Sequence, residues 1–212
     1  MCIRDRYKHF IVAPHGMRSF FEYMIRQETE NAKKGLPSGI TVKVNSLVDP
    51  KIIELLYEAS KAGVRVQLIV RGICCLIPGI EGVSENITVM SIVGQLLEHS
   101  RIFRFENAGN PRIYMGSADW MPRNLDRRVE LVFPIEDETQ KARAFGILDT
   151  MLSDTTNARF MQSDTSYEHV DLRGKKKISS QLTFYHEAQA RLKELQSIEK
   201  DSVLIPIHSA EE

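Results

Sequence analysis

The order of apolar and polar residues along the chain predicts short strands that alternate with amphipathic helices. A strand is expected at 9–13 and another at 40–44, where apolar and polar residues alternate as in a half-buried strand. Between them, apolar residues at helical spacing predict a helix from Met17 to Lys34 that ends near Gly35.

A helix with clear start and stop residues follows the second strand. Asp49 is a good N-cap, the proline after it suits the first helical position, and Gly63 ends the helix. A run rich in β-branched residues at 64–70 then predicts another strand. Strand, helix and strand with short links predict a right-handed parallel crossover, and therefore an α/β fold. Ligands of such sheets bind beyond the carboxyl ends of the strands, where Asn45 and Arg71 stand here.

The rest of the chain predicts further strands, two more helices and a change of character near residue 170. Strands are expected at 87–90, 101–105, 112–115 and 129–134, the second and third of them as a hairpin, and helices at 139–152 and 180–200. We therefore expect a main domain at 7–170, followed at 171–212 by a linker and a charged helical tail. Residues 1–6 resemble the artefactual, non-native start of a truncated gene.

Composition limits the class of protein without indicating its chemistry. The 212 residues are 42% hydrophobic and 26% charged, which is ordinary for a soluble globular protein. The apolar stretches are too short for a membrane span, and the polar first residues do not form a signal peptide. Three cysteines cannot form a disulfide framework. We expect a cytoplasmic protein that could join a membrane-associated complex.

Positive charge is concentrated in the middle of the chain. Residues 61–128 hold more Lys and Arg than Asp and Glu, whereas residues 129–170 show the reverse. Several of these arginines stand at strand ends or in loops rich in Gly or Pro. This placement favours an anion site formed by the fold over a nucleic-acid surface, so nucleic acid is not an expected partner.

The strongest candidate for chemistry is a histidine followed by an arginine and, later, by a Gly-Ser pair. His99 stands two residues before Arg101, so on a strand both side chains would share one face. The predicted hairpin would return Ser117 and Asp119 to the same place. An imidazole can attack phosphorus or transfer a proton, a fixed cation neutralises phosphate oxygens, and a carboxylate or hydroxyl can orient the ring. The set predicts phosphoryl chemistry.

This constellation resembles half of the phospholipase D site, in which His-x-Lys is followed after four residues by Asp and later by Gly-Ser-x-Asn. Arg101 stands here at the lysine position and Glu106 at the acid position. Because arginine binds phosphate bidentately and lysine acts as a point charge, the exchange disfavours ordinary phosphodiester hydrolysis. A phospholipase-D-like phosphodiesterase or nuclease is one alternative.

Four longer sequence segments are similar to the C-terminal domain of the long-class bacterial polyphosphate kinases. They lie at 45–50, 68–75, 91–102 and 117–128, and the similarity extends over about residues 8–170. The resemblance implies a phospholipase-D-like mixed sheet flanked by helices. It also implies an enzyme that reversibly transfers the terminal phosphate of ATP to polyphosphate through a phosphohistidine, with Mg²⁺ as cofactor.

The resemblance further implies roles for single residues. Arg71 matches the family's ATP-contacting arginine, His99 matches its second catalytic histidine, and Arg101 is a further expected phosphate ligand. Weaker candidates for binding the polyanion are Asn45, Ser117, Asp119, Arg123, Arg127 and Arg128. The phosphohistidine and the magnesium-linked arginines match no residue of this chain, so upstream domains of the same enzyme are expected to supply them.

The partners implied by the family are ATP, ADP and polyphosphate, and the complete enzyme is expected to form homo-oligomers. The fragment alone is expected to be inactive or to bind phosphate weakly. An inactive phosphate-binding module is therefore the second alternative.

Overall fold

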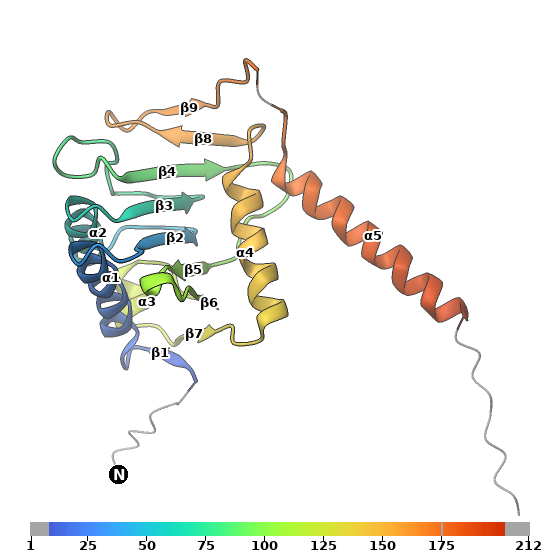
Figure 1. The fold of residues 1–212 in the computed structure, drawn as a ribbon, viewed down its shortest axis with the longest axis horizontal. Coiled ribbons are helices and arrows are strands. Elements are labelled where there is room, and N and C mark those ends of the chain that lie inside the picture. Colours follow the sequence, from blue (N-terminus) through green and yellow to red (C-terminus); the bar gives the residue numbers. More distant parts are fainter. Residues whose placement is uncertain (1–8, 175, 202–212) are drawn as a thin grey trace, which may run out of the picture.

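A mixed sheet with helices on both faces forms the body of the protein in the computed structural model (Figure 1). The structure describes residues 9–174 and 176–201, and within them the sheet has nine strands in the order β1-β7-β6-β5-β2-β3-β4-β8-β9. The strands are β1 (Ile11–Ala13), β2 (Gly39–Val44), β3 (Arg65–Val70), β4 (Ile87–Ile92), β5 (Ile102–Phe105), β6 (Arg112–Gly116), β7 (Glu130–Pro134), β8 (Ala158–Met161) and β9 (Tyr167–His169). The helices are α1 (Met17–Lys33), α2 (Pro50–Lys61), α3 (Pro122–Asp126), α4 (Glu138–Leu152) and α5 (Ser180–Asp201), with a 3₁₀ turn at Asn107–Gly109.

The predicted parallel crossover is the centre of the sheet. β2 pairs in parallel with β3, and β3 pairs in parallel with β4. Asp49 caps α2 by accepting a hydrogen bond from the Ile52 backbone N at 3.0 Å. The same buried carboxylate accepts two hydrogen bonds from Arg18 of α1, at 2.6 and 3.0 Å. One aspartate therefore starts α2 and fastens it to α1.

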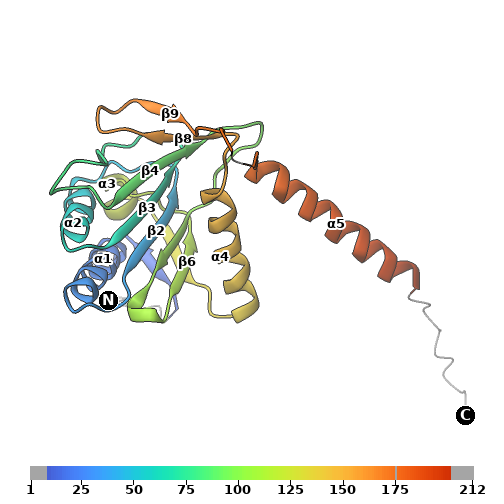
Figure 2. The same cartoon turned by 45° about the horizontal axis from the view of Figure 1, so that its top comes forward.

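Two hydrophobic clusters fill the space above and below the sheet, as the alternation of side chains along a strand requires. The larger cluster joins α1 and α2 to one face through residues such as Phe21, Leu55 and Val42. The smaller one joins α4 to the other face through residues such as Leu148 and Ile69. Figure 2 shows α1 and α2 on one side of the strands and α4 on the other.

A close approach of two strand ends shapes the region after β2 and β3. The Gly72 backbone N donates to the Asn45 carbonyl oxygen at 2.8 Å. A Cβ atom at Gly72 would lie only 2.8 Å from that same oxygen, so a side chain there would push the strand ends apart. The glycine keeps Arg71 beside Asn45.

The elements confirm most of the expected order, including the hairpin of β5 and β6. Three elements were missed: the one-turn helix α3 and the edge strands β8 and β9, which are too short for a clear period. The prediction of a half-buried strand at 40–44 was wrong, because β2 lies in the middle of the sheet and both of its faces are covered.

The C-terminal helix begins against the sheet and then extends away from it (Figure 1). Asp154 accepts hydrogen bonds from the backbone N and the hydroxyl of Ser180, both at 2.7 Å. No helix in the described part of the chain has the length and apolar character needed to cross a membrane. The start expected to be non-native, residues 1–6, and the last residues of the predicted tail, 202–212, lie outside the described residues.

Candidate phosphate-binding site

Asn45 and Arg71 lie side by side at the carboxyl ends of β2 and β3, as the sequence predicts. Arg71 donates from Nε to the Asn45 side-chain oxygen at 2.9 Å. Among the described residues, its two terminal nitrogens have no hydrogen-bond acceptor. The Asn45 contact therefore orients the guanidinium and leaves its outer edge available to an anion.

Asp119 connects this pair to Arg101. Its Oδ1 accepts from the Asn45 backbone N at 2.7 Å and from Arg101 Nε at 3.2 Å, while its Oδ2 accepts from Arg101 Nη2 at 3.0 Å. The side chains of Arg101 and Asp119 are only 12% and 10% exposed. A two-point contact of this kind at low exposure fixes the plane of the Arg101 guanidinium.

The third group is His99, which lies beside Arg101 but not on a strand. β5 begins at Ile102, so His99 belongs to the loop before it, and the expectation of two residues on one strand face was wrong. Arg101 Nη1 donates to the His99 carbonyl oxygen at 2.8 Å and lies 3.1 Å from ring Nδ1. The same Nη1 lies 3.4 Å from ring Nε2, so the contact places a positive charge against the His99 ring without selecting one of its two nitrogens.

The loop that carries His99 is held from beneath by Lys43 of β2. Lys43 is 1% exposed, and its Nζ donates to the carbonyl oxygens of Glu98 and Ser100 at 2.8 and 2.9 Å. These two carbonyls flank His99. Burial lowers the pKa of Lys43 to about 8, although the Glu98 carboxylate acts in the opposite direction.

The same loop is held from the side by the first turn of α5. Gln181 accepts from the Leu96 backbone N at 3.0 Å, and it donates to the Leu96 carbonyl oxygen and to a Glu98 carboxylate oxygen, at 2.9 and 3.0 Å. Sequence reasoning found neither Lys43 nor Gln181. A signal existed for Lys43, since a lysine inside the first strand of a parallel crossover has to be buried.

Ser117 turns toward a different carboxylate. Its hydroxyl donates to Glu130 and accepts from the Leu131 backbone N at 3.1 Å, and the Asn124 side chain also donates to Glu130. Neither Ser117 nor Asp119 contacts the His99 ring, so the prediction that a hydroxyl or carboxylate orients the ring was wrong. Arg101 contacts the ring instead.

The remaining predicted residues divide between the two ends of the sheet. Arg123, Arg127 and Arg128 are exposed in and just after α3, and the segment before α3 runs beside Asn45 to Asp49. Glu106, expected at the acid position, lies at the far end of β5 and pairs with Arg104 at 3.3 Å. The carboxylate at the site is therefore Asp119.

The site offers little to a metal ion. The described residues contain no group of three or more His, Cys, Asp or Glu side chains that could hold one. Both oxygens of Asp119 already accept hydrogen bonds, and cationic side chains surround them. The side chains present at this site do not fit Mg²⁺.

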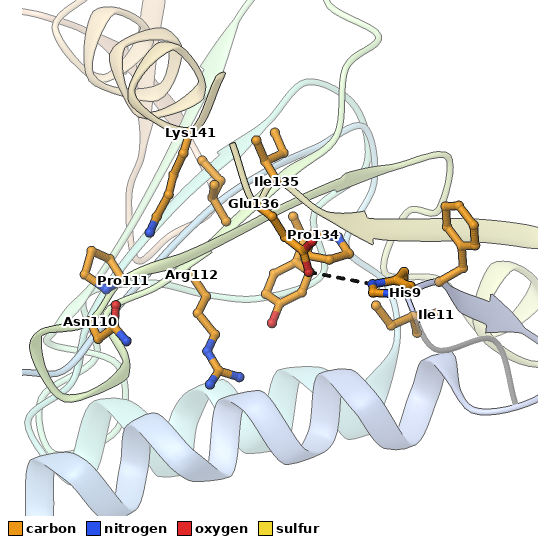
Figure 3. A pocket seen from close by; sticks show the side chains of 12 residues that line it. His9, Ile11, Asn110, Pro111, Arg112, Pro134, Ile135, Glu136 and Lys141 are labelled. Carbon is orange, nitrogen blue, oxygen red and sulfur yellow. Dashed lines mark ion pairs between the residues drawn. The ribbon is translucent and has the colours of Figure 1, made fainter. Parts of the chain in front are cut away.

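A cavity lies at the opposite end of the sheet, where β6 begins and β7 ends. It measures about 480 Å³ and is lined by residues that include His9, Arg112, Glu136 and Lys141. Figure 3 shows His9 pointing toward Glu136, and the two side chains approach to 3.8 Å. None of the residues predicted to bind phosphate lines this cavity.

Comparison with known proteins agrees with the predicted family. Residues 10–181 match the polyphosphate kinase C-terminal domain 2 family. The polyphosphate kinase of Lactiplantibacillus plantarum is 50% identical over 182 residues, which are 86% of this chain and 25% of that protein. The polyphosphate kinase of Escherichia coli K12 is 44% identical over 84% of this chain and 26% of its own length.

Solved structures show the same relationship. The crystal structure of polyphosphate kinase from Porphyromonas gingivalis superposes with a TM-score of 0.84 at 36% identity, covering 88% of this chain and 28% of that one. Nuc from Salmonella typhimurium, a phospholipase D family member, has a TM-score of 0.51 at 15% identity, covering 73% of this chain and 97% of its own, and this likeness concerns the fold alone. The predicted phospholipase-D-like α/β fold is confirmed. The chain spans about a quarter of the length of the curated relatives it matches, and it belongs to the polyphosphate kinase C-terminal domain 2 family.

Proposed function

We propose that this chain supplies the nucleotide-facing half of the active site of an ATP–polyphosphate phosphotransferase. The reaction is the reversible transfer of the terminal phosphate of ATP to polyphosphate. The observation that carries the proposal is the connected set of Arg71, Asn45, Asp119, Arg101 and His99 at the carboxyl edge of the sheet. The expected phosphohistidine would come from a domain upstream of this chain.

Within this half-site, Arg71 is the residue best placed to bind a phosphate group. Its Nε is engaged by Asn45, which fixes the direction in which the outer N–H groups point. A fixed guanidinium binds phosphate oxygens at two points, and it loses less conformational entropy than a free one when it does so.

Arg101 contributes mainly through its effect on His99. Its Nε and Nη2 are engaged by Asp119, and its Nη1 by the His99 carbonyl oxygen. Few of its donors are left for phosphate, so we assign to Arg101 the positioning of His99 and a fixed positive charge. The resemblance implied that Arg101 binds phosphate directly, and we propose this positioning role in its place.

His99 is the candidate proton donor and acceptor. It is exposed, and Arg101 Nη1 lies beside its ring, 3.1 Å from Nδ1 and 3.4 Å from Nε2. When the bond between the terminal phosphorus of ATP and its bridging oxygen breaks, charge accumulates on that oxygen. A proton from the imidazolium form of His99, or a hydrogen bond from its neutral form, stabilises that charge.

The test uses the full-length enzyme that carries this chain, with radiolabelled ATP and recovery of acid-insoluble polymer. His99→Gln is expected to lower kcat by about 10²- to 10⁴-fold, as loss of a general acid does. His186→Gln, on the exposed face of α5, is the matched control. A His99→Gln enzyme with normal kcat would refute the role, and cleavage of a phosphodiester reporter by the unaltered enzyme would favour the phosphodiesterase alternative.

A further inference from the structure

A second pocket lies directly beside Arg71, between the ends of β3 and β4 and the edge hairpin of β8 and β9. It measures about 350 Å³. Its lining residues are Arg71, Gly72, Ser91, Val93, Asn157, Arg159 and Tyr167. Sequence reasoning assigned no role to the hairpin residues among them.

The strand register explains why these side chains meet. Ser91 of β4 is the direct partner of Arg159 in β8, and Tyr167 of β9 is the partner of Met161, two residues further along β8. Direct partners, and residues two apart on one strand, project from the same face of a sheet. Ser91 also donates to the Arg71 carbonyl oxygen at 3.4 Å, which connects this face to the end of β3.

The charge of the pocket is unbalanced. Arg71 and Arg159 line it, and no carboxylate occurs among the described residues that do so. Arg159 is exposed, and within the part of the chain that the structure describes its guanidinium makes neither a hydrogen bond nor an ion pair. Among the described residues, Arg71 uses only Nε for a hydrogen bond. Two guanidiniums with uncommitted N–H groups thus share one cavity, an arrangement that an anion with several oxygens would stabilise.

We propose that Arg159 is a second anion-binding residue of the site, and that this pocket binds the phosphoanhydride chain next to the phosphate held by Arg71. A single phosphate needs one guanidinium fork, whereas a chain of linked phosphates presents oxygens to two in succession. The ligand class rests on the proposed function, since ATP and polyphosphate share this chemistry. Tyr167 also lines the pocket, and its hydroxyl can donate a further hydrogen bond.

Isothermal titration of the 212-residue chain with inorganic tripolyphosphate tests the proposal. Arg159→Gln is expected to raise Kd about tenfold, as loss of a charge-assisted contact does, and Arg159→Lys is expected to raise it less. Arg26→Gln, which removes the same charge from an exposed position on α1, is expected to leave Kd nearly unchanged. Circular dichroism confirms that each variant is folded.

The outcomes separate this inference from the proposed function. If Arg71→Gln weakens binding and Arg159→Gln does not, the second residue is refuted while the proposed function stands. If Arg159→Gln weakens binding and Arg71→Gln does not, the pocket stands and the proposed phosphate contact of Arg71 fails. No binding by the unaltered chain overturns the pocket. Parallel titrations of Arg159→Gln with ATP and with long-chain polyphosphate identify which ligand occupies the pocket. A higher Kd for ATP indicates the triphosphate of the nucleotide, and a change in Kd for long-chain polyphosphate alone indicates the polymer.

Discussion

Replacing Lys43 by methionine tests whether the lysine holds the loop that carries His99. The ammonium donates to the two carbonyls on either side of His99, at 2.8 and 2.9 Å, from a position that is 1% exposed. Methionine keeps an unbranched chain of similar length and removes both donors. The packing beneath the loop is therefore largely retained while its attachment is lost.

The expected size follows from these contacts. Hydrogen bonds to a charged group contribute about 1.5–3 kcal/mol each, so the two together would hold the loop by roughly 3–6 kcal/mol. Removing the ammonium also removes the cost of burying it, which is the cost that lowers its pKa to about 8. With that offset, we expect a net loss of about 1.5–3 kcal/mol in local stability, or roughly a ten- to hundredfold increase in loop opening.

Hydrogen exchange followed by mass spectrometry measures that increase. Peptides that cover 93–101 in Lys43→Met are expected to exchange roughly ten- to hundredfold faster, while peptides that cover α2 keep their rates. Lys51→Met, which removes an exposed lysine paired with Glu54 at 3.3 Å, is the control and should change neither region. Unchanged exchange at 93–101 in Lys43→Met would show that Lys43 does not hold the loop that carries His99.

Two further predictions concern stability. Because the pKa of Lys43 is about 8 when folded and about 10.5 when unfolded, the unfolded chain binds more protons between these values, and the free energy of unfolding should rise with pH across that window. Urea titrations at pH 7.5–10.5 measure this rise, and an equal rise in Lys43→Met would contradict its assignment to Lys43. Asp119→Asn leaves Arg101 without its carboxylate and should lower the free energy of unfolding by about 3 kcal/mol, against less than about 1 kcal/mol for exposed Asp126→Asn. Similar losses in the two variants would contradict the structural role of Asp119.

Local signals in the sequence account for the parts of the fold that were predicted. The cap at Asp49, the glycine at Gly63 and the β-branched run of β3 each act over a few neighbouring residues, and together they specify the parallel crossover. That crossover places Asn45 and Arg71 at one edge of the sheet. The positions of both residues could therefore be predicted before their contacts were known.

Contacts between distant parts of the chain account for what was missed. Spacing alone pointed to Glu106 as the carboxylate of the site. Because β5 is four residues long, Glu106 lies at its far end. The hairpin register brings Asp119 to Arg101 instead. The burial of Lys43 depends on strands that pair with β2 from both sides. Gln181 contacts the His99 loop from α5, which the sequence predicts to be part of a polar tail.

An amide NMR titration of this chain with inorganic tripolyphosphate tests directly whether phosphate binds at the carboxyl edge of the sheet. We expect concentration-dependent shifts at Arg71, Gly72 and His99, at the end of the sheet where these residues make their contacts. Shifts confined to Arg112 and Lys141, in the cavity at the opposite end, would contradict this expectation.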